Sequence, residues 1–145
     1  MIITPQEIGK LHLDSQIVGF ASGCMDLLHY YHLHYLERCK AQCDFLIVGV
    51  DSDELLTFFK AKQATIPEHH RVAMVAALRC VDAAFILRNL KQFESIIPHV
   101  HKIFKNKPEL YGQPIIGAEK AELVIIPDIQ ELTSTSEIVN HIQNK

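Results

Sequence analysis

The chain has 145 residues, of which 48% are hydrophobic and 21% charged, a composition typical of one globular domain spanning residues 1–145. A formal net charge of −3 provides no basic excess to neutralise a phosphate backbone, so we expect no nucleic-acid partner. The longest apolar runs have strand length, and the amino-terminal residues lack the pattern of a secretory signal, so we expect a cytoplasmic protein without a membrane partner.

Strands and helices alternate in the first half of the chain. The Thr-Pro-Gln-Glu sequence at Thr4 is a helix start and predicts a short helix over residues 5–12. The apolar segment 17–21 predicts a strand, and residues 30–42 predict a helix with an apolar stripe. Residues 45–50 are apolar without alternation, which is typical of a strand covered on both faces.

The second half continues this pattern. The segment 104–120, with two prolines and two glycines, is expected to be a loop with at most one short helix. The other predicted elements are helices opening at 51–54 and at 67–68, a strand at 83–87, a helix at 91–97, a strand at 123–126 and a helix at 134–142. Such alternation predicts an α/β fold, a Rossmann-like parallel sheet flanked by helices, with ligands bound beyond the carboxyl ends of the strands.

Two histidines follow the first predicted strand. Residues 23–36 read GCMDLLHYYHLHYL, in which Gly23 and Asp26 precede His29 and His32. A spacing of three places both imidazoles on one helical face, beside the free N–H groups of the helix start. The sequence therefore predicts an anion site, with phosphate as the expected anion and each neutral imidazole donating one N–H. No third ligand has a compatible spacing, so we do not expect these histidines to bind a metal.

Two further segments contain residues suited to phosphate. Ser134 and Glu137 match a capping box at the last predicted helix, which on its own needs no ligand. Lys60, Lys62 and Arg71 flank a turn, where basic residues on their own are ordinarily solvated surface.

Together these segments resemble the motifs of the cytidylyltransferase-like nucleotidyltransferase superfamily. Residues 23–36 are similar to G-x-F-D-x-x-H-x-G-H-x-x-x-L, the run from Lys62 to Arg71 is similar to K-x-x-P…E-x-R, and residues 133–138 (TSTSEI) are similar to I-S-T-S/T-x-I. The resemblance covers residues 17–84 and 123–142. It is shared with the adenylyltransferase domain of ADP-heptose synthase and with glycerol-3-phosphate, ethanolamine-phosphate and choline-phosphate cytidylyltransferases.

The resemblance implies transfer of CMP or AMP from CTP or ATP to a small phosphorylated acceptor, a polyol, amino-alcohol or sugar phosphate, with release of pyrophosphate. It also implies Mg²⁺ bound with the triphosphate and a possible homodimer. The implied residues are His29, His32 and Lys62 for catalysis, Lys105 for the acceptor, and, for the nucleotide, Gly23, Cys24, Met25, Asp26, Arg71, Ser134, Thr135 and Ser136. Asp26 is equally suited to orienting His29, approaching the metal or capping a turn.

The chain also departs from the family motifs. Met25 replaces an aromatic residue, Tyr31 replaces the glycine of H-x-G-H, and Asn106 and Lys107 stand where glycines follow Lys105 in the heptose branch. The arginine that usually precedes the late motif of the cytidylyltransferases is missing. Two alternatives therefore stay open: a catalytically weak nucleotide-binding protein, acting as a sensor or assembly partner, and an unrelated flavodoxin-like domain that binds a phosphate ligand.

Overall fold

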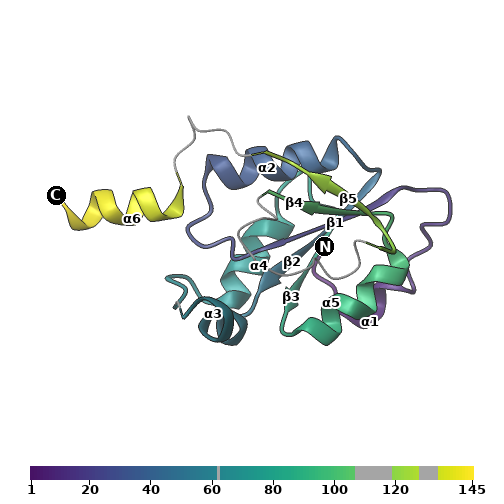
Figure 1. The fold of residues 1–145 in the computed structure, drawn as a ribbon, viewed down its shortest axis with the longest axis horizontal. Coiled ribbons are helices and arrows are strands. Elements are labelled where there is room, and N and C mark those ends of the chain that lie inside the picture. Colours follow the sequence, from purple (N-terminus) through teal and green to yellow (C-terminus); the bar gives the residue numbers. More distant parts are fainter. Residues whose placement is uncertain (62, 107–118, 128–133) are drawn as a thin grey trace.

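The computed structural model describes residues 1–61, 63–106, 119–127 and 134–145. Its centre is a five-stranded sheet in the order β3-β2-β1-β4-β5, and every neighbouring pair is parallel (Figure 1). The strands are β1 (Val18–Gly23), β2 (Phe45–Asp51), β3 (Ala83–Leu87), β4 (Lys102–Lys105) and β5 (Glu122–Ile125). The predicted parallel α/β fold is confirmed. The strand order reverses between β1 and β4, and a crevice for ligands is expected there.

Helices cover both faces of the sheet. They are α1 (Pro5–Ile8), α2 (Tyr30–Lys40), α3 (Asp53–Lys60), α4 (Glu68–Ala76), α5 (Leu90–Ile96) and α6 (Thr135–Gln143), with a short 3₁₀ turn, η1 (Ile97–His99), after α5. The core divides into two clusters, one beneath α2 and α4 and the other beneath α1 and α5. Helix α6 contributes no buried residue and projects from the domain together with the C-terminus, at the left of Figure 1.

Strand β2 shows why the core has two sides. Leu46, Val48 and Val50 belong to the cluster beneath α2 and α4, whereas Ile47 belongs to the opposite cluster. Each of these side chains is 0% exposed, as predicted for an apolar run without alternation. The carboxyl end of β1 is thereby held between well-packed neighbours, which fixes the place where the histidine-bearing segment begins.

The sequence prediction differs most from the structure at one strand and at one helix end. The sequence predicts no strand at β4 and places Phe104 in a loop, because only the apolar pair Ile103 and Phe104 marks this strand between polar residues. Both side chains are 0% exposed, one in each core cluster. The first helix ends at Ile8 rather than near residue 12, with Gly9, a poor helix former, at its C-cap.

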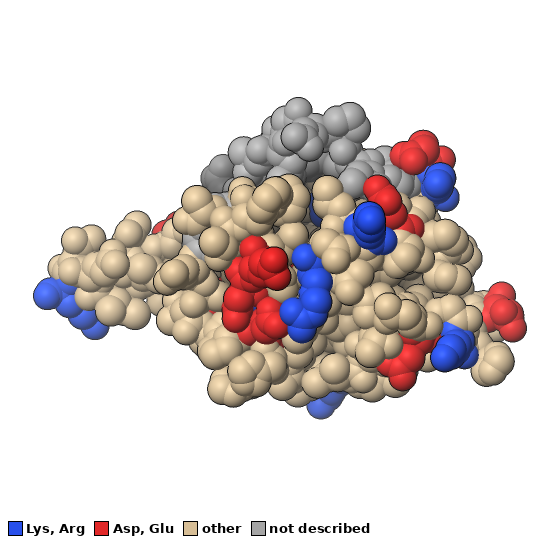
Figure 2. All heavy atoms as spheres, turned by 90° about the horizontal axis from the view of Figure 1, so that it is seen from below, with Lys and Arg blue, Asp and Glu red and all other residues tan. Residues whose placement is uncertain are grey.

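The described surface carries charges of both signs. On the face shown in Figure 2, basic and acidic side chains are interspersed among the described residues. One exposed pair joins Arg88 to Glu68 at 3.0 Å. None of the described helices combines the length and the hydrophobicity needed to cross a membrane.

Candidate functional site

The segment between β1 and α2 is held in an unusual backbone conformation. Met25 and Leu27 have φ values of 53° and 48°, in the left-handed region that side chains other than glycine rarely adopt. Each such residue costs on the order of 1–3 kcal/mol and persists only where its surroundings hold it in place. The loop directs Asp26 inward and leads to His29, the N-cap of α2.

Asp26 lies between these two residues and latches the loop to a distant segment. It is 2% exposed, and its two carboxylate oxygens accept the backbone N–H groups of Thr65 at 2.8 Å and Ile66 at 3.0 Å. Its backbone oxygen accepts the hydroxyl of Thr135 at 3.1 Å. The carboxylate is therefore engaged by backbone groups of the turn before α4. The orienting, metal-approaching and turn-capping roles considered from the sequence stay predictions.

Arg71 provides a second buried connection. Its side chain is 1% exposed, and Nη1 donates to the backbone oxygens of Cys24 at 2.6 Å and Asp51 at 2.7 Å. Nε donates to the backbone oxygen of Ile66 at 2.8 Å, and Nη2 pairs with the Asp53 carboxylate at 2.7 Å. The guanidinium thus joins the ends of β1 and β2 to α3 and to the turn before α4. A direct contact of Arg71 with a nucleotide stays a prediction.

His32 is held as a neutral donor. Its Nδ1 accepts the backbone N–H of His29 at 3.2 Å, so the ring proton lies on Nε2. Burial, together with the neighbouring His29, lowers the pKa of His32 to about 4. The ring centroids of the two histidines are 4.1 Å apart. At neutral pH, His32 is therefore an uncharged imidazole that can donate through Nε2.

His29 shares this tautomer, for a different reason. Its Nε2 lies 3.0 Å from the hydroxyl oxygen of Thr135, whose own proton is donated to the backbone oxygen of Asp26. His29 must therefore be the donor in the bond to Thr135. Its Nδ1 is then an acceptor, and it is a buried atom for which the described residues provide no hydrogen-bond donor. Burial lowers the pKa of His29, so the ring is neutral as well.

The start of α6 reaches the histidine pair from the far end of the chain. Ser134 is the N-cap, where its hydroxyl accepts the N–H of Glu137 at 3.2 Å and its own N–H meets the Glu137 carboxylate at 3.3 Å. This is the predicted capping box. Thr135 lies 106 residues from His29 in sequence, yet their side chains are hydrogen-bonded. The structure thus brings the start of α6 to the His29 imidazole through Thr135, whereas Ser136 is exposed.

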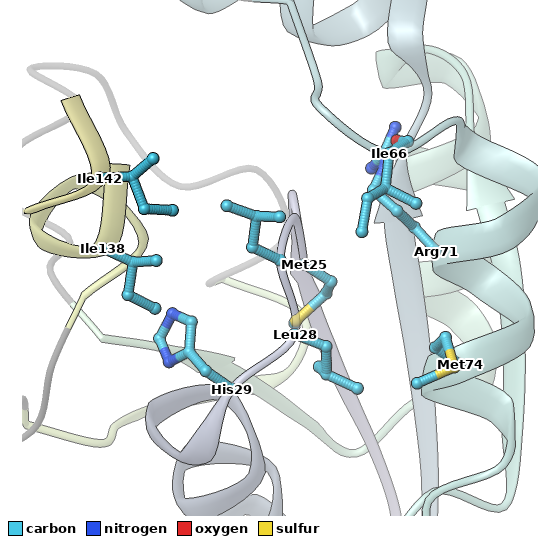
Figure 3. A pocket seen from close by; sticks show the side chains of 9 residues that line it. Met25, Leu28, His29, Ile66, Arg71, Met74, Ile138 and Ile142 are labelled. Atoms are coloured by element: carbon cyan, nitrogen blue, oxygen red, sulfur yellow. The ribbon is translucent and has the colours of Figure 1, made fainter. Parts of the chain in front are cut away.

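A cavity of about 380 Å³ opens next to His29. In the close view of Figure 3, His29 lies on the same side as Ile138 and Ile142 of α6, opposite Ile66 and Met74. The lining residues are mostly apolar: Met25, Leu27, Leu28, His29, Ile66, Arg71, Met74, Ile138 and Ile142. The volume is in the range of small-molecule sites, and an apolar cavity beside polar donors suits a planar ring attached to an anion.

The other predicted residues fall into different places. Lys105, at the end of β4, donates to Ser22 Oγ of β1 at 3.3 Å, across the point where strand order reverses. Gly23 lies at the end of β1, where an added Cβ would approach Met25 Cε at 3.2 Å. Lys62 lies outside the described residues. Sequence reasoning missed the backbone donors of the turn before α4, because backbone groups give no side-chain signal.

Comparison with known proteins identifies the chain's relatives. The family model for cytidylyltransferase-like proteins matches residues 20–143. The Bifunctional protein HldE of Helicobacter pylori is 33% identical over 135 residues, which are 90% of this chain and 29% of that protein. The Bifunctional protein HldE of Helicobacter hepaticus is 34% identical over 130 residues, 89% of this chain and 27% of that protein. The chain thus spans under a third of these curated relatives.

Solved structures agree on the fold. The lipopolysaccharide core biosynthesis protein from Thermoplasma volcanium superposes with a TM-score of 0.67 at 25% identity, over 80% of this chain and 100% of that one. Pantothenate synthetase from Thermus thermophilus has a TM-score of 0.59 at 14% identity, over 95% of this chain and 70% of that one, and supports the fold alone. With the family match extending over residues 20–143, the chain belongs to the cytidylyltransferase-like family of nucleotidyltransferases.

Proposed function

We propose that the protein transfers a nucleotidyl group from ATP or CTP to a small, hydroxylated phosphate ester and releases pyrophosphate. The observation that carries this proposal is the meeting of His29, His32 and Thr135 at the start of two helices. Two uncharged N–H donors and two helix N-termini at one place suit a polyphosphate. The apolar cavity beside His29 would receive the base.

The reaction needs no covalent intermediate on the protein. A phosphate oxygen of the acceptor forms a bond to the α-phosphorus while the bond from that phosphorus to the bridging oxygen breaks, and pyrophosphate leaves with the electron pair. Charge accumulates on the oxygens around the α-phosphorus, where the Nε2–H groups of His29 and His32 donate. Because His29 already donates to Thr135, it can transfer that bond to a phosphate oxygen without a change of charge.

The β- and γ-phosphates are assigned to the start of α6, where Ser134, Thr135 and Ser136 add hydroxyls to the free backbone N–H groups. Mg²⁺ would be bound mainly by oxygens of the triphosphate and by water. The described residues contain no cluster of three metal-ligating side chains, and both oxygens of Asp26 accept backbone N–H groups. Lys62 remains the proposed cation for the phosphates.

The acceptor is assigned by class. Lys105 lies at the crevice between β1 and β4, where a lysine suits the phosphate of the acceptor. The structural neighbour from Thermoplasma volcanium is a lipopolysaccharide core biosynthesis protein, which supports a sugar-derived phosphate. A cytoplasmic location, where ATP and CTP are supplied, and a homodimer belong to the same proposal.

The test is pyrophosphate release with ATP and with CTP, each against polyol, amino-alcohol and sugar phosphates. His29→Ala and His32→Ala should each lower turnover by about 10²-fold or more, the usual scale for removing one donor to the transition state. His34→Ala is the matched control, because this imidazole lies on the same helix and packs against Tyr30 at 5.9 Å. Near-normal turnover in both of the first two variants would contradict the mechanism.

A second function is favoured by Tyr31, whose ring lies 6.1 Å from that of His29. A phenol there can crowd the reacting groups, and the protein would then bind a nucleotide without turning it over. No pyrophosphate release with any acceptor, while ATP or CTP still raises the melting temperature, would identify this function. Loss of that rise in His32→Ala would show that the histidine pair binds the nucleotide.

A further inference from the structure

The ammonium group of Lys105, at the end of β4, is held by two uncharged groups. Its Nζ donates to Ser22 Oγ at 3.3 Å and lies 5.4 Å from the centroid of the Phe93 ring. A cation within about 6 Å of a ring centroid is attracted by the electron-rich face of the ring. Because neither the hydroxyl nor the ring carries a charge, these two contacts fix the ammonium without neutralising it.

The Phe93 ring is itself held by the core. It is 7% exposed, and it meets the Phe20 ring edge to face at a centroid distance of 5.3 Å. Phe20 is 1% exposed and stacks on Phe85 at 6.0 Å, so the three rings form one aromatic cluster. A ring packed in this way has little freedom to move. Lys105 therefore contacts a fixed aromatic surface.

The alternation of side chains along the strands explains why these groups meet. Phe20 of β1 is paired with Ile103 of β4, and both belong to the core cluster beneath α1 and α5. Ser22 and Lys105 lie two positions further along the same two strands, so they project from the same face of the sheet. Phe93 belongs to α5, which covers this face. The contact thus follows from the sheet register and from the place of α5.

The carboxyl end of the sheet therefore carries phosphate-binding groups from both faces. His32 belongs to α2, which packs on the other core cluster, whereas Lys105 projects from the α5 face. A reaction between two phosphate groups needs a separate place for each, because both are anions. The proposed function gives the histidines to the triphosphate and Lys105 to the acceptor, whose phosphate suits a point charge.

We propose that Phe93 is a positioning residue for the acceptor: its ring holds the Lys105 ammonium, beside Ser22, in place for the phosphate of the acceptor. A lysine side chain has several rotatable bonds and loses much of their freedom when it binds an anion. Contact with the Phe93 ring restricts those bonds before the acceptor arrives, and such preorganisation makes binding tighter. This inference rests on the proposed nucleotidyl transfer, and it concerns the acceptor phosphate rather than the nucleotide.

The test replaces Phe93 by trifluorophenylalanine, which keeps the shape of the ring but removes the negative charge of its face. With the acceptor that gives the highest turnover, KM for that acceptor should rise by about threefold or more, whereas kcat and KM for the nucleotide should stay within about twofold of wild type. The same replacement at Phe85 is the matched control, because this ring belongs to the same aromatic cluster but stacks on Phe20. An unchanged acceptor KM in the Phe93 variant, or an equal rise in the Phe85 variant, overturns the proposal.

A second background separates positioning from a purely structural effect. Lys105→Met removes the ammonium and keeps an unbranched side chain, so fluorination of Phe93 should no longer change kcat/KM for the acceptor. A distortion caused by the fluorines would lower kcat/KM in both backgrounds. Equal effects with and without Lys105 therefore contradict the proposal.

Binding separates this proposal from the proposed function. If wild-type protein releases no pyrophosphate with any pair, nucleotidyl transfer fails, but the role of Phe93 is still tested by NMR titration of lysine-labelled protein with inorganic phosphate, the group that all the acceptors share. The signal of Lys105, identified by its loss in Lys105→Met, should shift with phosphate, and the fluorinated Phe93 variant should raise the dissociation constant by about threefold or more. Equal dissociation constants in the two proteins, or no response of the Lys105 signal in wild-type protein, overturn the proposal.

Discussion

Acidification should destabilise the fold through His32. The ordinary pKa of a histidine is about 6.5, whereas burial and the neighbouring His29 lower that of His32 to about 4. The unfolded chain then binds the proton more readily than the native state. The stability contributed by neutral His32 is complete above the unfolded pKa and is lost as pH falls from about 6.5 toward 4. Between about pH 7 and pH 4.5, this linkage removes about 2 kcal/mol from the free energy of unfolding.

Urea unfolding at several pH values, with His32→Gln beside wild-type protein, measures this effect. Glutamine can accept the backbone N–H of His29 but does not titrate, so the variant keeps the hydrogen bond and lacks the linkage. Other groups also titrate in acid, and the difference between the two proteins cancels them. Wild-type protein should lose about 2 kcal/mol more than the variant on acidification. A difference that stays constant from neutral to acidic pH would refute the assignment of His32 as a buried neutral imidazole.

Three substitutions test the loop and its connections. Arg71→Lys should lower the free energy of unfolding by at least about 2 kcal/mol, because an ammonium cannot replace the four directed hydrogen bonds of the guanidinium. The control, Arg88→Lys in the exposed pair with Glu68, should lower it by less than about 0.5 kcal/mol. Equal losses of the two variants in urea unfolding would contradict the buried role of Arg71. Asp26→Asn should cost about 2 kcal/mol, since an amide NH₂ would face a backbone N–H, and a melting temperature like that of wild type would argue against the latch. Gly23→Ala should leave stability within about 1 kcal/mol, because only the flexible Met25 methyl must move, but should weaken ATP and CTP binding by calorimetry; unchanged affinity would remove the nucleotide from the end of β1.

The fold was predictable where hydrophobic patterns were long. The unbroken apolar run 45–50 and the alternation of strands with helices were enough for a parallel sheet. Strand β4 was missed because four residues with one apolar pair carry too little periodicity. Its place is decided by pairing with β1 and β5, which are far away in sequence.

The parts of the site that depend on local sequence patterns were predictable as well. The histidine spacing and the capping box are local patterns, and the structure brings both to one place. Asp26 and Arg71 could be singled out by residue type, but their partners are mainly backbone groups 5 to 47 positions away, and such groups are the same in every residue. The contact between Tyr31 and Asn106 was hidden for the same reason, since each looked like an isolated departure from a motif.

Helix α6 has a thermodynamic consequence for ligand binding. It runs for nine residues and buries none of them, so tertiary packing adds little to its helicity. A helix this short is marginal in water on its own, and a polyanion at its N-terminus would stabilise it. Part of the binding free energy of a triphosphate would therefore be used to order α6. The binding enthalpy would then be more favourable than the affinity alone suggests, and an unfavourable binding entropy would oppose it. Amide hydrogen exchange at the residues of α6 that line neither the cavity nor the phosphate site would then report occupancy of the site.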